Sequence, residues 1–221
     1  MSIPVKIDFV SDVSCPWCVI GLRSLEAALA RVAGVLTPDI HFQPFELNPQ
    51  MSAQGEDVAE HIARKYGSSP EELARSQEMI RARGAELGFE FALGQRKRIY
   101  NTFDAHRLLH WAEDTGKQEA LKNALFAAYF TEGRNPSDPE VLVSLATRVG
   151  LDADRARQIV ESDEYADEVR AREQWYLDRG IHAVPAVILN GRYLIQGGQP
   201  VEVFEAALRK LAAEASAAQP A

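Results

Sequence analysis

Alternating apolar and polar residues open the chain, and helical spacing follows them. Residues 5–10 alternate and then turn apolar, which predicts a first strand. From Pro16 onward, apolar residues recur at helical spacing as far as Gly34, a residue type suited to ending a helix. Residues 40–47 predict a second strand, in which Pro44 indicates an edge position or an irregularity. We therefore expect strand, helix and strand in residues 1–50.

The middle of the chain has a different character, because helical periodicity dominates residues 51–179. Gly, Pro and Asp signals separate the predicted helices, and Ser69-Pro70-Glu71-Glu72 is typical of a capped helix start. The helices are expected near residues 56–66, 70–87, 97–115, 117–131, 138–149, 152–160 and 162–179.

Strands return after this helical block. Residues 186–189 and 192–195 predict two short strands, and Asn190-Gly191 between them is a strong hairpin signal. A last amphipathic helix is expected at 200–213, followed by a flexible tail at 216–221. The predicted fold class is α/β. Its outer parts, residues 1–50 and 180–215, resemble a thioredoxin fold that an all-helical insertion domain, residues 51–179, interrupts.

Charge and composition exclude several classes of partner. The formal net charge of −8 over 221 residues argues against a nucleic-acid surface, where Lys and Arg cluster. The one dense basic run, Arg96-Lys97-Arg98, fits the solvated start of a helix better than a phosphate or polyanion site. No apolar run is long enough for a membrane helix, and the first residues do not have a signal-peptide pattern. We therefore expect a cytoplasmic protein without a membrane partner.

The chain has 2 cysteines, Cys15 and Cys18, which excludes a framework of structural disulfides. A pair at this spacing is either half of a metal site or a redox centre. Zinc needs four ligands, and His106 and His110, four residues apart on one predicted helix, could supply two of them in principle. The position of the pair, directly after a strand and at the start of a helix, favours the redox centre, so no metal is expected.

A cysteine at the start of a helix gains reactivity from its position. Free backbone N–H groups and the helix dipole stabilise a thiolate at Cys15, which should attack a substrate disulfide. Cys18 lies one turn further along, more deeply buried, and should resolve the mixed disulfide. Pro16 suits the first helical turn. Trp17 is either a packed aromatic residue or an apolar landing surface for substrate.

Val184-Pro185 precedes the late strand. An X-Pro bond at such a place can be cis in a tight turn, or the proline can simply begin the strand. The combination with the dithiol favours the cis form.

Several motifs resemble DsbA-like oxidoreductases of the FrnE type, which are related to 2-hydroxychromene-2-carboxylate isomerase-like proteins. The resemblance implies dithiol–disulfide exchange, a cis Pro185 that faces the dithiol, and a Val184 backbone that pairs with extended substrate. Trp17 departs from the histidine of periplasmic DsbA. The motifs are residues 11–18 with Gly21, residues 44–49, residues 101–108, Val184-Pro185, Gly191-Arg192-Tyr193 and residues 197–200.

Polar residues of the insertion are further candidates. Asn101 and Asp104 are three apart in a predicted helix, and are either capping and surface residues or, as the resemblance favours, part of a polar cleft wall. His106 could exchange protons near neutral pH. Asp12 and Glu46 are alternative proton handlers near Cys18.

Three functions remain open. The leading one is an oxidoreductase or isomerase for disulfides of proteins or small thiols, as a monomer or homodimer with no tightly bound cofactor. The second is a glutathione-dependent isomerase or transferase on a small aromatic or polyketide substrate. The third is a binding or chaperone module. The motif in its context favours the first.

Overall fold

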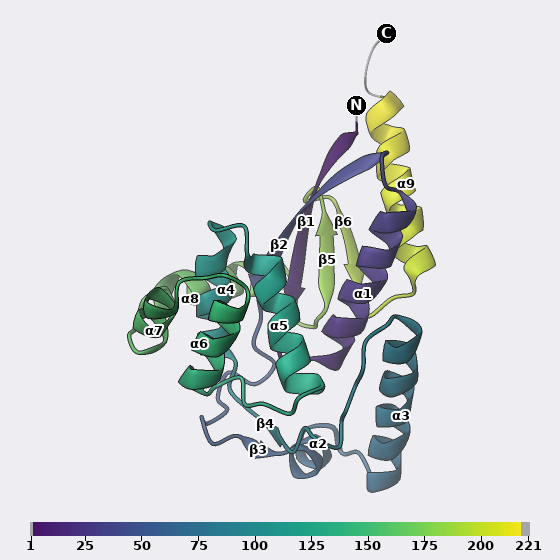
Figure 1. The fold of residues 1–221 in the computed structure, drawn as a ribbon. Helices are drawn as coiled ribbons and strands as arrows, with labels where there is room; N and C mark the ends of the chain where they lie inside the picture. The colour runs from purple at the N-terminus through teal and green to yellow at the C-terminus, as the bar shows by residue number, and fades with distance from the viewer. Residues whose placement is uncertain (1, 218–221) are drawn as a thin grey trace.

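A four-stranded sheet organises the molecule, whose computed structural model describes residues 2–217 (Figure 1). The strand order is β2-β1-β5-β6; β1 pairs with β2 in parallel, whereas β1–β5 and β5–β6 are antiparallel. Gly191, in the left-handed region with φ 65°, helps to form the hairpin turn as expected. The strands are β1 (Ile3–Ser11), β2 (Leu36–Pro44), β5 (Ala186–Leu189) and β6 (Tyr193–Gln196).

Helices α1 (Pro16–Arg31) and α9 (Val201–Ala217) run side by side along this sheet (Figure 1). Their apolar faces and the inward side chains of the strands form one buried cluster, to which Phe9, Leu22 and Phe204 belong. Complete burial of each such side chain stabilises the fold by roughly 1.5–3 kcal/mol. The cluster fixes α1, and therefore the dithiol at its start, against the sheet.

The chain between β2 and β5 is helical, as predicted, apart from a small antiparallel sheet of two-residue strands. Helices α4 to α7 share a second buried cluster, whereas α2, α3 and the small sheet lie near the end of the main sheet where α1 begins (Figure 1). The elements are β3 (Glu56–Asp57), α2 (Val58–Tyr66), α3 (Pro70–Glu86), β4 (Arg98–Ile99), α4 (Phe103–Glu113), α5 (Gln118–Phe130), α6 (Pro139–Arg148), α7 (Ala153–Val160) and α8 (Ala166–Leu177).

Three predicted boundaries were wrong. The second strand covers residues 36–44, because it pairs with β1 along its whole length. The helix expected from residue 97 begins at Phe103, since Arg98 and Ile99 pair with β3 instead. The run Arg96-Lys97-Arg98 is therefore not a helix start. Helix α9 continues through residues 216 and 217, and the rest of the predicted tail, 218–221, lies outside the described residues.

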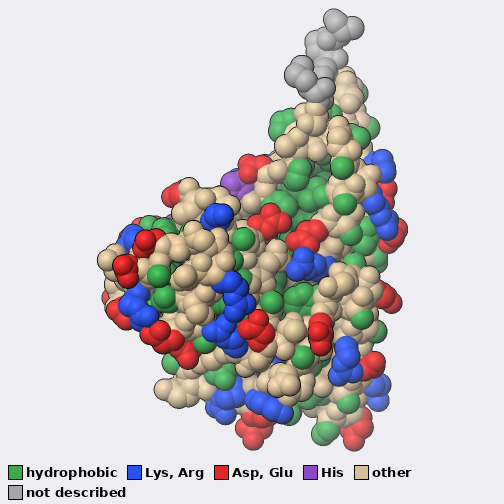
Figure 2. Space-filling view, in the orientation of Figure 1, with side chains coloured by type: hydrophobic (Ala, Val, Ile, Leu, Met, Phe, Trp, Pro, Cys, Tyr) green, Lys and Arg blue, Asp and Glu red, His purple; other side chains and the backbone are tan. Residues whose placement is uncertain are grey.

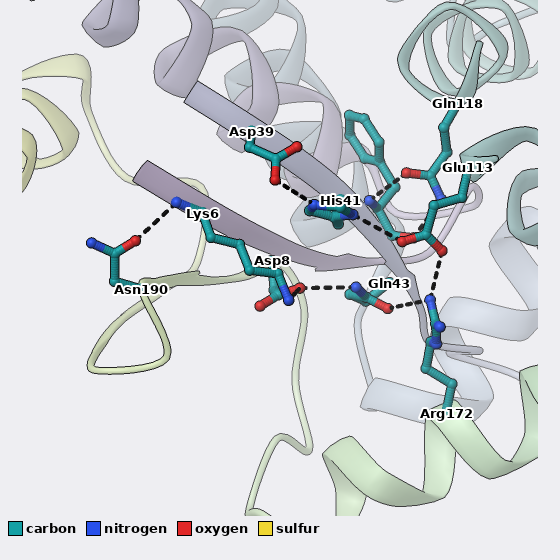
Figure 3. A network of polar contacts seen from close by, with 10 residues as sticks. Lys6, Asp8, Asp39, His41, Gln43, Glu113, Gln118, Arg172 and Asn190 are labelled. Carbon is teal, nitrogen blue, oxygen red and sulfur yellow. Dashed lines mark hydrogen bonds and ion pairs between the residues drawn. The ribbon is translucent and has the colours of Figure 1, made fainter. Parts of the chain in front are cut away.

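Polar side chains fasten the helical segment to the edge of the sheet. We call this contact the β2 joint; it consists of the side chains of His41, Glu113, Gln118 and Arg172 (Figure 3) and the backbone of Phe42. The Gln118 amide accepts from Phe42 N at 2.8 Å and donates to Phe42 O at 3.1 Å. Glu113 accepts from Arg172 at 2.7 Å and lies 2.8 Å from His41 Nδ1. The joint satisfies backbone groups that an edge strand otherwise leaves unpaired.

Basic and acidic side chains are interspersed over the face drawn in Figure 2. Within the described part of the chain, no helix combines the length and the apolar character needed to cross a bilayer.

Candidate active site

The turn between β1 and α1 is built around the carboxylate of Asp12, which is almost fully buried. Its oxygens accept hydrogen bonds from Ser14 N at 3.1 Å, Ser14 Oγ at 2.9 Å and Leu47 N at 2.7 Å. Cys15 N in turn donates to Asp12 O at 3.2 Å. The turn therefore holds Cys15 in one position at the start of the helix.

Cys15 is the N-cap residue of α1, and Pro16 occupies the first turn, where its missing N–H costs nothing. No side chain caps this helix end, so its free N–H groups and dipole are available to a thiolate at Cys15. The two cysteines are not joined by a disulfide, and Cys15 Sγ donates to Val184 O at 3.8 Å. Both sulfurs therefore lie in the first turn of α1, and Cys15 contacts the loop before β5.

Cys18 lies beneath Cys15 and is completely buried. Burial raises the pKa of the Cys18 thiol well above its usual value, and the neighbouring Cys15 raises it further. Lys122 and a backbone hydrogen bond act in the opposite direction. Cys18 therefore stays protonated while Cys15 is free.

Lys122, on α5, is the residue that sequence reasoning missed. Its side chain is completely buried, its Nζ has no hydrogen-bond partner within residues 2–217, and it lies 4.9 Å from the centroid of the Phe126 ring. Burial lowers the pKa of Lys122 to about 8, although the nearby Cys18, Asp12 and Cys15 act to raise it. An amine that titrates there can take or return a proton near neutral pH.

Asp12 behaves differently. Burial alone would raise its pKa, but the imidazole of His106 and the backbone N–H groups of Leu47 and Ser14 outweigh burial and lower the pKa of Asp12 to about 2. His106 Nε2 lies 3.6 Å from the Asp12 carboxylate. A carboxylate with such a pKa stays ionised, so Asp12 is better suited to organising the turn than to collecting a proton.

The loop before β5 faces the start of α1. The Val184–Pro185 peptide bond is cis, as the sequence resemblance implied. Gly21 makes the close approach possible, since a Cβ at that position would lie 3.0 Å from Pro185 Cγ. With the hydrogen bond from Cys15 to Val184 O, these contacts bring Cys15, Cys18, Val184 and Pro185 together.

A cavity of ≈ 650 Å³ opens beside Cys15, Pro16, Trp17 and Val184. Its volume lies within the range of pockets that bind small molecules. Its other walls come from the loop after β2 and from the inserted segment, and they are largely apolar. The apolar wall residues are Phe45, Leu47, Val58, Ile62, Tyr66, Leu73, Ile80, Leu93 and Ile99.

Three predicted site residues lie elsewhere. Asn101 precedes α4 instead of sharing a helix face with Asp104, and its side chain accepts from Phe103 N at 2.8 Å. Asp104 pairs with Arg107 at 2.8 Å. Neither residue lines the cavity, and nor does His106, which is buried against Asp12.

Glu46 and His110, the remaining candidates, also have other neighbours. Glu46 lines the cavity, but its carboxylate pairs with Arg170. His110 packs 5.2 Å from the ring centroid of Tyr165. Among residues 2–217, no group of three or more His, Cys, Asp or Glu side chains is arranged to hold a metal ion.

The sheet with α1 and α9, the cysteine pair at the start of α1 and the cis-proline loop that faces it define a protein of the thioredoxin fold. The chain belongs to the family described as DSBA-like thioredoxin domain, whose model matches residues 6–209.

Similar proteins support this membership. A probable DsbA oxidoreductase from Streptomyces coelicolor has a crystal structure with a TM-score of 0.87 and 34% identity, covering 98% of this chain and 92% of that chain. The uncharacterized protein YwbO of Bacillus subtilis is 29% identical over 205 residues, or 92% of this chain and 96% of that protein. The cytosolic disulfide reductase DsbM of Pseudomonas aeruginosa, solved with GSH, shares the fold at a TM-score of 0.65 and 19% identity, covering 93% and 98% of the two chains. The predicted α/β, DsbA-like fold is confirmed.

Proposed function

We propose that this protein is a thiol–disulfide oxidoreductase or isomerase in which Cys15 is the nucleophile and Cys18 the resolving residue. The observation that carries the proposal is the contrast between the two thiols. Cys15 caps a helix and lines a cavity, whereas Cys18 is completely buried and has a strongly raised pKa. Such a contrast separates an attacking thiol from a resolving one.

The reaction begins when the Cys15 thiolate attacks one sulfur of a substrate disulfide. The substrate S–S bond breaks, a mixed disulfide forms, and the departing thiolate takes a proton from solvent. Cys18 then transfers its proton to the neutral amine of Lys122 and attacks Cys15 Sγ. The Cys15–Cys18 disulfide forms as the mixed disulfide breaks, and the second substrate sulfur leaves as a thiolate that takes a proton from the Lys122 ammonium, so the substrate is reduced and the dithiol oxidised. The reverse sequence oxidises a substrate dithiol.

The substrate lies, in this proposal, against Pro16, Trp17 and the Val184 backbone, which line the cavity beside Cys15. Pro185 holds the Val184 carbonyl toward Cys15. Substrates are protein or small-molecule thiols and disulfides, and glutathione is a candidate co-substrate.

Replacement of Cys15 tests the mechanism most directly. Cys15→Ser should abolish both insulin reduction and reactivation of scrambled ribonuclease, because no thiolate remains to attack. Cys18→Ala should accumulate mixed disulfides on Cys15, which mass spectrometry identifies. Activity that survives in Cys15→Ser would contradict the proposal.

A second candidate is a glutathione-dependent isomerase or transferase, which the largely apolar cavity beside Cys15 favours. Such chemistry needs one thiol site rather than two. Activity that requires Cys15 and glutathione but survives Cys18→Ala would select this candidate over the first.

A further inference from the structure

Arg96 stands out among the side chains that line the Cys15 cavity. Its guanidinium lies 5.3 Å from the ring centroids of both Tyr129 and Phe130, at the end of α5. Its Nε is buried and has no hydrogen-bond partner within residues 2–217, and no ion pair to Arg96 occurs there either. Stacking on two aromatic rings holds the guanidinium in place without neutralising it.

The acids along the cavity wall have other partners. Glu46 pairs with Arg170, and Glu72 accepts from Ser69 N at 2.8 Å as part of a helix cap. A second cation, Lys65, lies at the exposed rim, where its Nζ donates to Leu47 O at 2.7 Å and Asn48 Oδ1 at 2.8 Å. Among the described residues, neither Arg96 nor Lys65 forms an ion pair with a carboxylate, although both line a cavity whose walls are largely apolar.

A partly buried guanidinium without a counterion is costly, and a bound carboxylate removes that cost through paired, charge-assisted hydrogen bonds. We propose that Arg96 is the anion-binding residue of the cavity, and that Cys15 acts on small disulfides that combine an apolar body with a carboxylate. The inference rests on the proposed function, since it names the substrate class of the same site. The apolar body lies along the cavity walls, the carboxylate meets Arg96, and the disulfide lies beside Cys15.

Two aromatic disulfides that differ in charge test this assignment. The reduced protein is oxidised by 5,5′-dithiobis(2-nitrobenzoate), which carries carboxylates, and by neutral 4,4′-dithiodipyridine, and the ratio of the two rates is measured. Arg96→Gln should lower this ratio by roughly 10- to 100-fold, the loss expected for one charge-assisted hydrogen bond. Lys97→Gln removes the same charge from an exposed neighbour that does not line the cavity, and should leave the ratio unchanged.

An unchanged ratio in Arg96→Gln would overturn the assignment, whether or not both rates fall. If the Arg96→Gln variant does not fold, an inhibition experiment on the wild-type protein tests the same assignment. 2-Naphthoate should slow its reaction with the neutral disulfide more than 2-naphthamide does, and equal effects of the two compounds would overturn the proposal. Failure of the proposed function looks different, because wild-type and Cys15→Ser proteins would then react alike with both disulfides.

Discussion

Two of the contacts between the inserted segment and the thioredoxin-like part of the molecule differ in how their charged side chains are paired. At the β2 joint, Glu113 lies between His41 and Arg172, and Gln118 satisfies the backbone of Phe42. At the dithiol and its cavity, Lys122 Nζ and Arg96 Nε contact aromatic rings but have no hydrogen-bond partner among the described residues. A buried charge without an ionic partner lowers stability, so the unpaired charges at the second contact fit the proposed function, whereas the paired groups of the first contact fit attachment.

Substitutions at the two contacts should therefore affect different properties, the free energy of unfolding in one case and the rate of thiol–disulfide exchange in the other. A change at the joint should lower stability and leave the exchange chemistry intact. A change at the dithiol contact should impair the chemistry at little cost in stability.

Lys122→Met should have the largest effect. Without the amine, Cys18 loses the group that takes its proton, and the resolution step should slow by roughly 100-fold at pH 7, with its pH profile moved to higher pH. The unfolding free energy should stay the same or rise, because an apolar chain of similar length replaces a buried cation. Stopped-flow measurement of resolution and urea unfolding provide the two values.

The matched control for this variant is Lys117→Met, which removes an exposed lysine just before α5. It should alter neither value. A Lys122→Met protein that resolves at the wild-type rate across the pH range would show that the amine plays no part in the proton transfer.

Gln118→Ala should have the next largest effect, this time on stability. The change leaves the buried N–H and C=O of Phe42 without partners and should lower the unfolding free energy by about 2 kcal/mol. Gln174→Ala, whose amide bonds only the exposed Asp178, should change it far less. If both variants lose the same stability, or if Gln118→Ala impairs exchange in the folded protein, the division between the two contacts fails.

His41→Asn should have the smallest effect, visible as a change in pH dependence. Burial acts to lower the pKa of His41, but its hydrogen bonds to Asp39 and Glu113 prevail and raise it. The folded state therefore favours the imidazolium. Its contribution to stability is fully present below the unfolded pKa of about 6.5 and is lost as pH rises through the higher folded pKa.

Urea unfolding at a series of pH values from 5 to 9 should show this loss in the wild type and a flatter curve in His41→Asn. Parallel curves for the two proteins would show that protonation of His41 does not contribute to the stability of the joint.

Local pattern was enough to predict the dithiol at the start of α1 and the hairpin at Asn190-Gly191, because both depend on neighbours in sequence. The limits of β2 and α4 depend on partners far along the chain, and were wrong for that reason. The burial of Lys122 could have been predicted from the apolar periodicity of the sequence. Lys122 lies on the buried face of α5 with Gln118, Leu121, Leu125 and Phe126, at helical spacing.

Arg96 could not have been assigned in the same way. Its run of basic residues looks solvated, and the direction of its side chain follows from the pairing of β3 with β4 and from the aromatic rings of α5. The positions of Asn101 and Asp104 depend on the same pairing, because it delays the start of α4.

The Gln118 amide binds the main chain of Phe42, not its side chain. Main-chain groups are the same for every amino acid except proline, which has no N–H. A change of the side chain at residue 42 therefore leaves these two hydrogen bonds available, provided that the new residue is not proline. The walls that the insertion contributes to the cavity are then free to diverge, and descendants of one scaffold can acquire new substrates while the anchorage stays constant.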